Sequence, residues 1–155
     1  MDFKDLNAII DFAIAKEIEA AEFYISVSEQ ESFSGKKEMF LEFAAEERKH
    51  QTLLEDFKAG NPIDKLDDYQ FKWITDIKRS DYVDDVDYKP GMPYNDILML
   101  AAKREESALA LYNQLLDNAE ASEAKKLFKM LCQEEAKHKL ALETMLDDYM
   151  AEMGD

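Results

Sequence analysis

Four stretches of the chain carry apolar residues at the three- and four-residue spacing of an amphipathic helix. They cover residues 5–30, the segment from just after Gly35 to about Gly60, residues 95 or 96 to about 118, and residues 122 to about 150. Asn95 or Asp96 is predicted to cap the third helix, and Ser122 the fourth. Four glycines and three prolines among 155 residues are too few for a β-rich chain with frequent turns. The pattern therefore predicts an all-α fold with four long helices.

The first and second halves of the chain repeat one another. Residues 8–57 align without a gap on residues 96–145, and 14 of these 50 positions are identical. Two copies are too few for a solenoid, so the repeat predicts one domain, residues 1–155, with two-fold pseudo-symmetry. The helix pairs 5–60 and 95–150 are its two halves.

Residues 61–94 lie outside the repeat and are predicted to be a crossover. If the second and third helices run parallel, the chain must return along the whole bundle, and this segment is long enough to do so. Its aromatic content argues against a disordered linker and favours packing on the bundle, with a short helix around residues 67–77. We therefore expect an antiparallel four-helix bundle with one long crossover.

Charge and cysteine content narrow the possible partners. The net charge of −16 repels phosphate backbones and anionic lipid surfaces, so nucleic acid and membranes are not expected partners. No apolar run is long enough to cross a membrane and the first residues do not resemble a signal peptide, which predicts a soluble cytoplasmic protein. The single cysteine, Cys132, excludes an intramolecular disulfide and a four-cysteine metal site within this chain. Any metal must therefore bind through oxygen and nitrogen.

Both histidines of the chain stand in a Glu-x-x-His motif, Glu47/His50 and Glu135/His138. Residues three apart share one face of a helix, so each pair can bind a metal ion. The motifs are 88 positions apart (135 − 47 = 88), and the same offset relates Glu17 to Glu105.

All four glutamates fall on the apolar stripes of their helices, where a buried carboxylate needs compensation. Two divalent cations would balance four carboxylates, and this oxygen-rich set with two imidazoles suits iron or manganese, although zinc also binds such sites well. The alternative, that the histidines are ordinary surface residues, requires this register to be accidental. We therefore predict a two-metal site, with iron as the expected metal.

Two neighbouring features carry less weight. Glu46 and Glu134 are also repeated and lie four residues before the histidines, so they are weaker ligand candidates. Cys132 aligns with Ala44, which favours a small packed residue over a redox-active thiol.

The ligand pattern, one glutamate from each of two helices and Glu-x-x-His from each of the other two, is that of ferritin-like di-iron carboxylate proteins. Within that superfamily the chain resembles the rubrerythrin family. The resemblance rests on residues 17–24 (EIEAAEFY) and 104–112 (REESALALY), each followed by a Glu-x-x-His motif.

The resemblance implies a ferritin-like bundle with a di-iron site that reduces hydrogen peroxide or dioxygen and protects against oxidative stress. It also implies a homodimer, an external electron donor such as a rubredoxin, and Tyr24 and Tyr112 as hydrogen-bond donors to ligand carboxylates.

The sequence departs from the family pattern in two respects. It contains no four-cysteine rubredoxin-like site, and Ala108 stands where many rubrerythrins carry an additional glutamate one turn after the ligand of the third helix. Glu106 points about 100° away from Glu105 and does not replace that side chain. The peroxidase reaction is therefore less firmly indicated than metal binding. An iron-storing ferroxidase and a structural metal site, such as zinc, remain alternatives.

Overall fold

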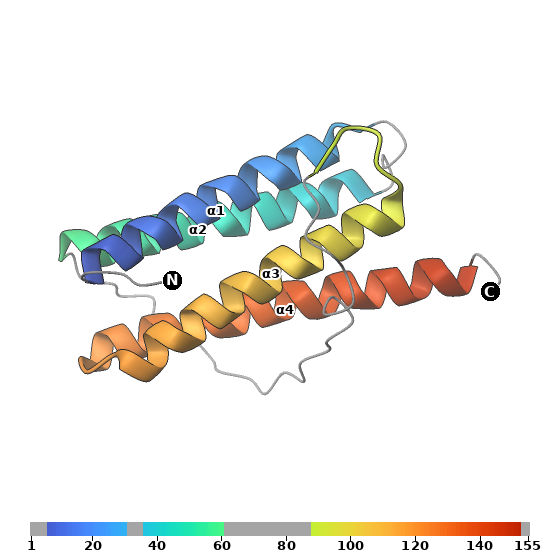
Figure 1. Ribbon diagram of the computed structural model, residues 1–155. Helices are drawn as coiled ribbons and strands as arrows, with labels where there is room; N and C mark the ends of the chain where they lie inside the picture. Colours follow the sequence, from blue (N-terminus) through green and yellow to red (C-terminus); the bar gives the residue numbers. More distant parts are fainter. Residues whose placement is uncertain (1–5, 31–35, 61–87, 153–155) are drawn as a thin grey trace. The chain divides into compact units, whose positions relative to one another are not determined.

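The computed structural model describes residues 6–30, 36–60 and 88–152 (Figure 1). These residues form four α-helices and no strand, as expected for the all-α class. The helices are α1 (Leu6–Ser28), α2 (Lys37–Ala59), α3 (Tyr94–Asn118) and α4 (Ser122–Glu152). The helix ends lie within two residues of those predicted from the apolar pattern.

The chain divides into two compact units, with the boundary between residues 69 and 70. Consecutive helices pack together in each unit, α1 with α2 and α3 with α4. Each unit is therefore a helical hairpin, and we call them the first and second hairpins. The expectation that residues 1–155 form one domain stays a prediction.

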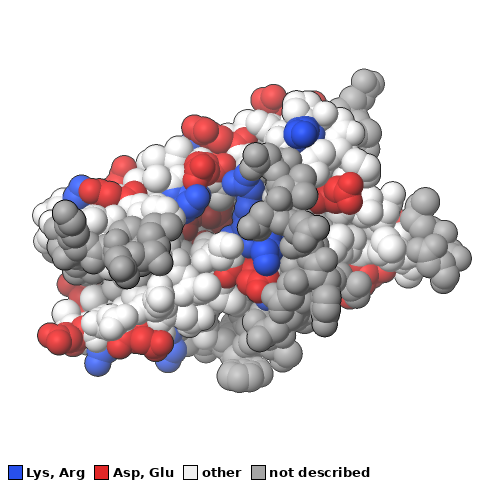
Figure 2. Space-filling view, in the orientation of Figure 1, with Lys and Arg blue, Asp and Glu red and all other residues white. Residues whose placement is uncertain are grey.

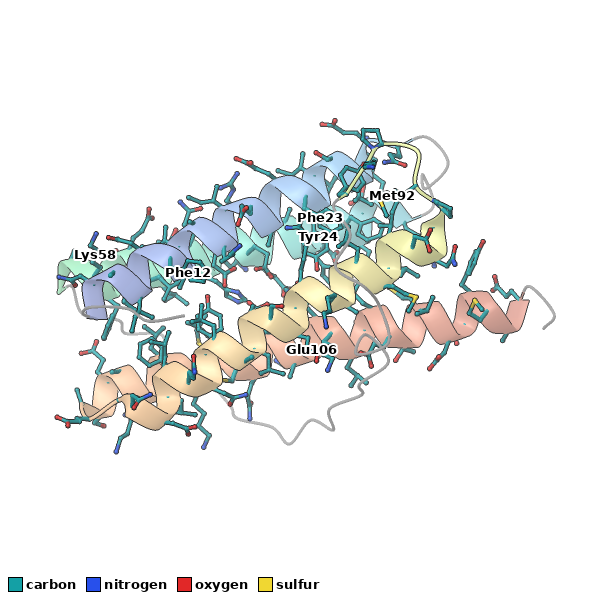
Figure 3. All side chains as sticks on the ribbon, viewed as in Figure 1. Phe12, Phe23, Tyr24, Lys58, Met92 and Glu106 are labelled. Carbon is teal, nitrogen blue, oxygen red and sulfur yellow. The ribbon has the colours of Figure 1, made fainter. Side chains whose placement is uncertain are left out.

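The first hairpin is antiparallel. Asp11 near the start of α1 forms an ion pair with Lys58 near the end of α2, and the Tyr24 ring near the end of α1 stacks on Phe40 near the start of α2. Figure 3 labels Lys58 and Tyr24 at these opposite ends of the hairpin. Ala13 and Leu54 lie between these contacts and are fully buried, as is Val27 beyond Tyr24.

The second hairpin has the same antiparallel register. The ring of Tyr94 at the start of α3 makes an edge-to-face contact with Tyr149 near the end of α4. Toward the other end, Cys132 on α4 donates to Asn113 on α3, with 3.4 Å between Sγ and Oδ1. Its core includes Ala101 and Leu142, the partners of Ala13 and Leu54 in the repeat, and both are completely buried.

The helix ends differ in their capping. Gly60 ends α2 in the left-handed conformation, with φ of 79°, and its N–H donates to the carbonyls of Asp56 and Phe57. Ala119 ends α3 with extended backbone instead, with φ of −75° and ψ of 136°. A residue with a Cβ atom adopts the extended form easily and the left-handed form only with strain. The end of α2 therefore depends on a glycine, and the end of α3 does not.

The predicted caps of α3 and α4 were wrong by one to three residues. Pro93 occupies the N-cap position of α3, so Asn95 and Asp96 lie inside its first turn. Proline restricts the preceding residue to extended backbone, which sets the start of the helix. Ser122 is likewise the first residue of α4 and does not precede it.

Only the last part of the predicted crossover, from residue 88, is described. There Pro90 and Gly91 occupy the centre of a turn in which Met92 N–H donates to the Lys89 carbonyl over 3.1 Å. Gly91 has φ of 90°, as the third position of a type II turn requires. The short helix expected around residues 67–77 lies outside the described residues.

Charged side chains are spread over the displayed face, with Asp and Glu interspersed among Lys and Arg (Figure 2). Among the helices described, none combines the length and apolar character that crossing a membrane requires.

Candidate metal centre

Each hairpin brings two glutamates and one histidine together. In the first hairpin these are Glu17 from α1 with Glu47 and His50 from α2. His50 Nδ1 lies 3.6 Å from Glu17 Oε2 and 4.0 Å from Glu47 Oε2. One ligand atom from each of the three residues lies within 4.8 Å of the others. We call Glu17, Glu47 and His50 the first ligand set.

The second hairpin holds the equivalent residues in the same arrangement. Glu105 comes from α3, and Glu135 and His138 come from α4. His138 Nδ1 lies 3.5 Å from Glu105 Oε1. Here too, one ligand atom from each residue lies within 4.8 Å of the others. These three residues form the second ligand set.

Helix geometry explains why each set converges. The glutamate and histidine of each Glu-x-x-His motif are almost one turn apart, so both side chains leave the helix on the face that packs against its partner. The third ligand, Glu17 or Glu105, lies near the middle of the neighbouring helix in the antiparallel hairpin. In both sets Nδ1 is the imidazole nitrogen that faces the carboxylates, so Nδ1 is positioned to bind a metal.

All six side chains are buried. The glutamates are exposed by 2% or less and the histidines by 3%. This excludes the alternative in which the histidines are surface residues of the helices. An ionised carboxylate in such surroundings is costly unless a cation compensates it. Each set carries two carboxylates, so one divalent cation per set restores charge balance, and the donor chemistry fits the predicted metal.

The weaker ligand candidates lie toward the surface. Glu46 and Glu134 are partly exposed. Glu134 Oε2 also lies 3.0 Å from the ammonium of Lys137, which is itself exposed. Their partial exposure favours ordinary surface roles for both residues, in agreement with their ranking as weaker ligand candidates.

Tyr24 and Tyr112 are both 1% exposed. The ring of Tyr24 lies among aromatic side chains of its hairpin, with centroid distances of 5.2 Å to Phe23, 6.2 Å to Phe40 and 5.4 Å to Phe43. Figure 3 labels Phe23 and Tyr24 side by side on α1. The burial fits the expected hydrogen bond to a ligand carboxylate, and that bond stays a prediction.

Cys132 is a buried free cysteine. Burial, with a smaller contribution from the charge of Asp117, raises the pKa of its thiol to about 12. A thiol that stays protonated is a poor nucleophile, since reactivity resides in the thiolate. The packing role predicted from the alignment with Ala44 agrees with this environment.

A group of charged residues beside the second ligand set was missed by the sequence analysis. Lys139 is 1% exposed and Glu143 is completely buried. Their i,i+4 spacing on one helix is a common ion-pair signal, but it does not reveal burial. Glu106 on α3, labelled in Figure 3, also approaches this lysine.

Comparisons with known proteins agree with the ligand pattern. The family model for rubrerythrin matches residues 8–146. A crystal structure of an uncharacterised conserved protein from Magnetospirillum magnetotacticum MS-1 superposes with a TM-score of 0.64 and 23% identity. The alignment covers 93% of this chain and 95% of that one. No match was found among curated proteins.

The fold class and the family of the chain follow from different observations. The four helices and the structural match assign the chain to the ferritin-like four-helix fold. The family model covers most of the sequence, so the protein belongs to the rubrerythrin family. The family and the buried glutamates and histidines together fit a di-iron protein.

Proposed function

We propose that this protein is a di-iron oxidoreductase that reduces hydrogen peroxide or dioxygen with electrons from an external donor. The observation that carries the proposal is the repeated, buried Glu-Glu-His set in each hairpin of a rubrerythrin-family chain. The six metal ligands are Glu17, Glu47, His50, Glu105, Glu135 and His138.

The donor set supports iron over most other metals. Hard carboxylate oxygens with borderline imidazole nitrogens suit iron and manganese, and two carboxylates per cation leave coordination positions for an oxidant. Zinc also accepts these donors, so either manganese or zinc can occupy the site in a purified sample. Redox chemistry distinguishes iron from zinc, which does not change its oxidation state.

The six ligands would hold two ferrous ions, which would supply the two electrons needed, with two protons, to reduce one hydrogen peroxide to two water molecules. The protein residues provide the environment for this chemistry. Each set places two carboxyl groups in the interior of its hairpin, and its histidine presents Nδ1 toward them. Burial to 3% exposure or less keeps bulk water from the ligands.

The remaining partners follow from composition and family. The chain contains one cysteine and thus no four-cysteine rubredoxin site of its own, so a separate protein such as a rubredoxin is proposed as donor. We also propose a homodimer located in the cytoplasm.

Anaerobic loading with two ferrous ions per chain tests the function directly. Hydrogen peroxide and dioxygen are then added in separate cuvettes, and the ferric absorption band is followed. Rapid oxidation, followed by re-reduction by a reduced rubredoxin, is expected. A shell-sized oligomer that accumulates ferric mineral would instead indicate storage, and absence of any ferric band would indicate a structural metal site.

Substitution of the two buried tyrosines tests their proposed hydrogen bonds to ligand carboxylates. Tyr24→Phe and Tyr112→Phe each remove one hydroxyl and keep the ring. Because groups that orient metal ligands typically contribute about 10- to 100-fold to activity, each variant should lose at least about 10-fold in peroxide reduction. Iron stoichiometry should stay unchanged. If both variants reduce peroxide at the wild-type rate, the two tyrosine hydroxyls have no role in the reaction and the side chains serve only packing.

A further inference from the structure

A buried lysine lies beside the second ligand set. Lys139 directly follows His138, and its ammonium is 4.0 Å from Glu143 Oε1 on the same helix and 4.0 Å from Glu106 Oε2 on α3. Lys139 and Glu143 are exposed by 1% and 0%, whereas the Glu106 side chain is 25% exposed. Lysine is almost never fully buried without a charged partner. We call Lys139, Glu143 and Glu106 the charge cluster.

Two members of the charge cluster directly follow metal ligands in the sequence. Glu105 and His138 approach each other across α3 and α4, and their sequence neighbours Glu106 and Lys139 approach each other across the same two helices. Along the axis of α4, Lys139 is about 1.5 Å from His138, and Glu143 is about 7.5 Å from it. Of the Lys139–Glu143 pair, Lys139 is thus the residue whose backbone lies nearer to His138 along the helix.

The first hairpin has no counterpart to this cluster. The positions equivalent to Glu106 and Lys139 are Ile18 and Gln51, and neither side chain carries a charge. Glu55, the partner of Glu143 in the repeat, is exposed and accepts a hydrogen bond from Gln51 Nε2 over 3.3 Å. The two ligand sets are alike, but the charges beside them differ.

We propose that Lys139 is a tuning residue that makes the two metal positions inequivalent. Its ammonium lowers the affinity of the second ligand set for a divalent cation, and the carboxylates of Glu143 and Glu106 offset that effect. The inference rests on the proposed function, because it takes the six ligands as metal-binding.

The positive and negative side chains of the cluster should have opposite effects on the affinity for a cation. A buried positive charge repels an incoming divalent cation, and a buried carboxylate attracts it. Both act through a protein interior whose effective dielectric constant is about 20, far below that of water. Loss of the ammonium therefore strengthens metal binding, and loss of the Glu143 charge weakens it. A purely structural role would instead make both substitutions weaken binding.

Cobalt binding to the second ligand set measures this effect without an activity assay. The full-length His50→Ala variant disables the first set, so one Co²⁺ per chain reports the second. Affinity is determined by competition with a chromophoric chelator, and the Co²⁺ absorption bands report ligand geometry. In this background, Lys139→Gln should tighten binding on the order of tenfold and Glu143→Gln should weaken it on the order of tenfold.

Two further variants guard against misfolding and general charge effects. The double variant Lys139→Gln/Glu143→Gln removes both charges and should bind Co²⁺ within about threefold of the background protein. Glu55→Gln is the matched control, because it changes the repeated but exposed position, and it should have no more than about a twofold effect. Thermal unfolding of each metal-free variant confirms that the chain is folded.

The outcomes separate this inference from the proposed function. Opposite shifts for the two single variants, with the double variant between them, support the tuning role. Equal weakening by both single variants, or no change in either, overturns it and leaves the metal site intact. If wild-type protein binds no Co²⁺, the metal site and the tuning role both fail.

Discussion

The two hairpins share their ligand positions and much of their core, and differ in the charges beside the ligands and in the ends of their second helices. Tyr24 and Tyr112 are each 1% exposed, and the two histidines are each 3% exposed, whereas Glu143 is fully buried and its counterpart Glu55 is exposed. The helix α2 ends at Ala59, whereas α4 continues past Asp148, the position equivalent to Gly60, to Glu152. The comparison shows that packing and metal-ligand positions follow the repeat, whereas capping and neighbouring charges do not.

Removing one histidine should have the largest effect, because it disables one of the two equivalent ligand sets. His50→Ala and His138→Ala each delete one imidazole ligand, so each variant should bind one iron ion in place of two. Peroxide reduction should fall more than about 100-fold in both, because the reaction needs a pair of iron ions. Metal analysis after anaerobic loading gives the stoichiometry. Lys49→Ala, an exposed neighbour of His50, should retain two irons. If a histidine variant still binds two irons, the substituted histidine is not a metal ligand.

Core substitutions test whether the hairpins contribute equally to stability. Phe40→Ala and Phe128→Ala remove rings exposed by 0% and 1%, and each should lower the free energy of unfolding by about 3–5 kcal/mol. Chemical denaturation of the metal-free protein measures both. Leu41→Ala, at a side chain 37% exposed, should change stability by less than about 1 kcal/mol. A large difference between the two phenylalanine variants would contradict equal packing in the hairpins.

Substitutions at the C-terminal ends of α2 and α3 should differ in cost, because the two ends have different backbone conformations. Gly60→Ala forces a Cβ atom into the left-handed region at φ of 79°, which costs roughly 1–2 kcal/mol. Ala119→Gly, just after the end of α3, introduces no strain because Ala119 has extended backbone, and it should cost less than about 1 kcal/mol through the entropy of the unfolded chain. Denaturation midpoints distinguish the two. Equal losses would mean that the glycine conformation is not the cause.

The smallest effect is expected at Cys132. Cys132→Ala restores the residue type found at Ala44 and should change stability by about 1 kcal/mol or less, with peroxide reduction unaltered. Because the pKa of the thiol is raised to about 12, the folded protein should resist alkylation at pH 8 and react once unfolded. Mass spectrometry after iodoacetamide treatment measures this. Rapid alkylation of the folded protein would show that the Cys132 thiol is reactive and would support a redox role for it.

The helices and ligands could be predicted because both leave periodic signals. The apolar stripes located every described helix, and Glu17, Glu47 and His50 fell on those stripes as polar residues that needed an explanation. The capping residue of α3 was predicted wrongly because Pro93, and not the polar side chains after it, occupies the N-cap position.

The charge cluster could not be predicted from the repeat. Glu55 and Glu143 are identical residues at equivalent positions, yet one is exposed and the other is fully buried. Their environments differ because Lys139 offers Glu143 an interior ammonium, whereas Gln51 offers Glu55 an amide at the surface. These partners are neighbours on the same helix, so the sequence shows the spacing of each pair, but whether a pair is buried depends on how the helix packs in the folded chain.

The central position of all six ligands within their helices has a kinetic consequence. Each of the six ligands belongs to a hydrogen-bonded helix, so none of them lies on a loop that could swing aside to release a bound cation. Exchange with a chelator must wait for a helix to loosen, so at high chelator concentration the rate of metal loss reports how often the helices open. Metal exchange thus becomes a measure of local unfolding.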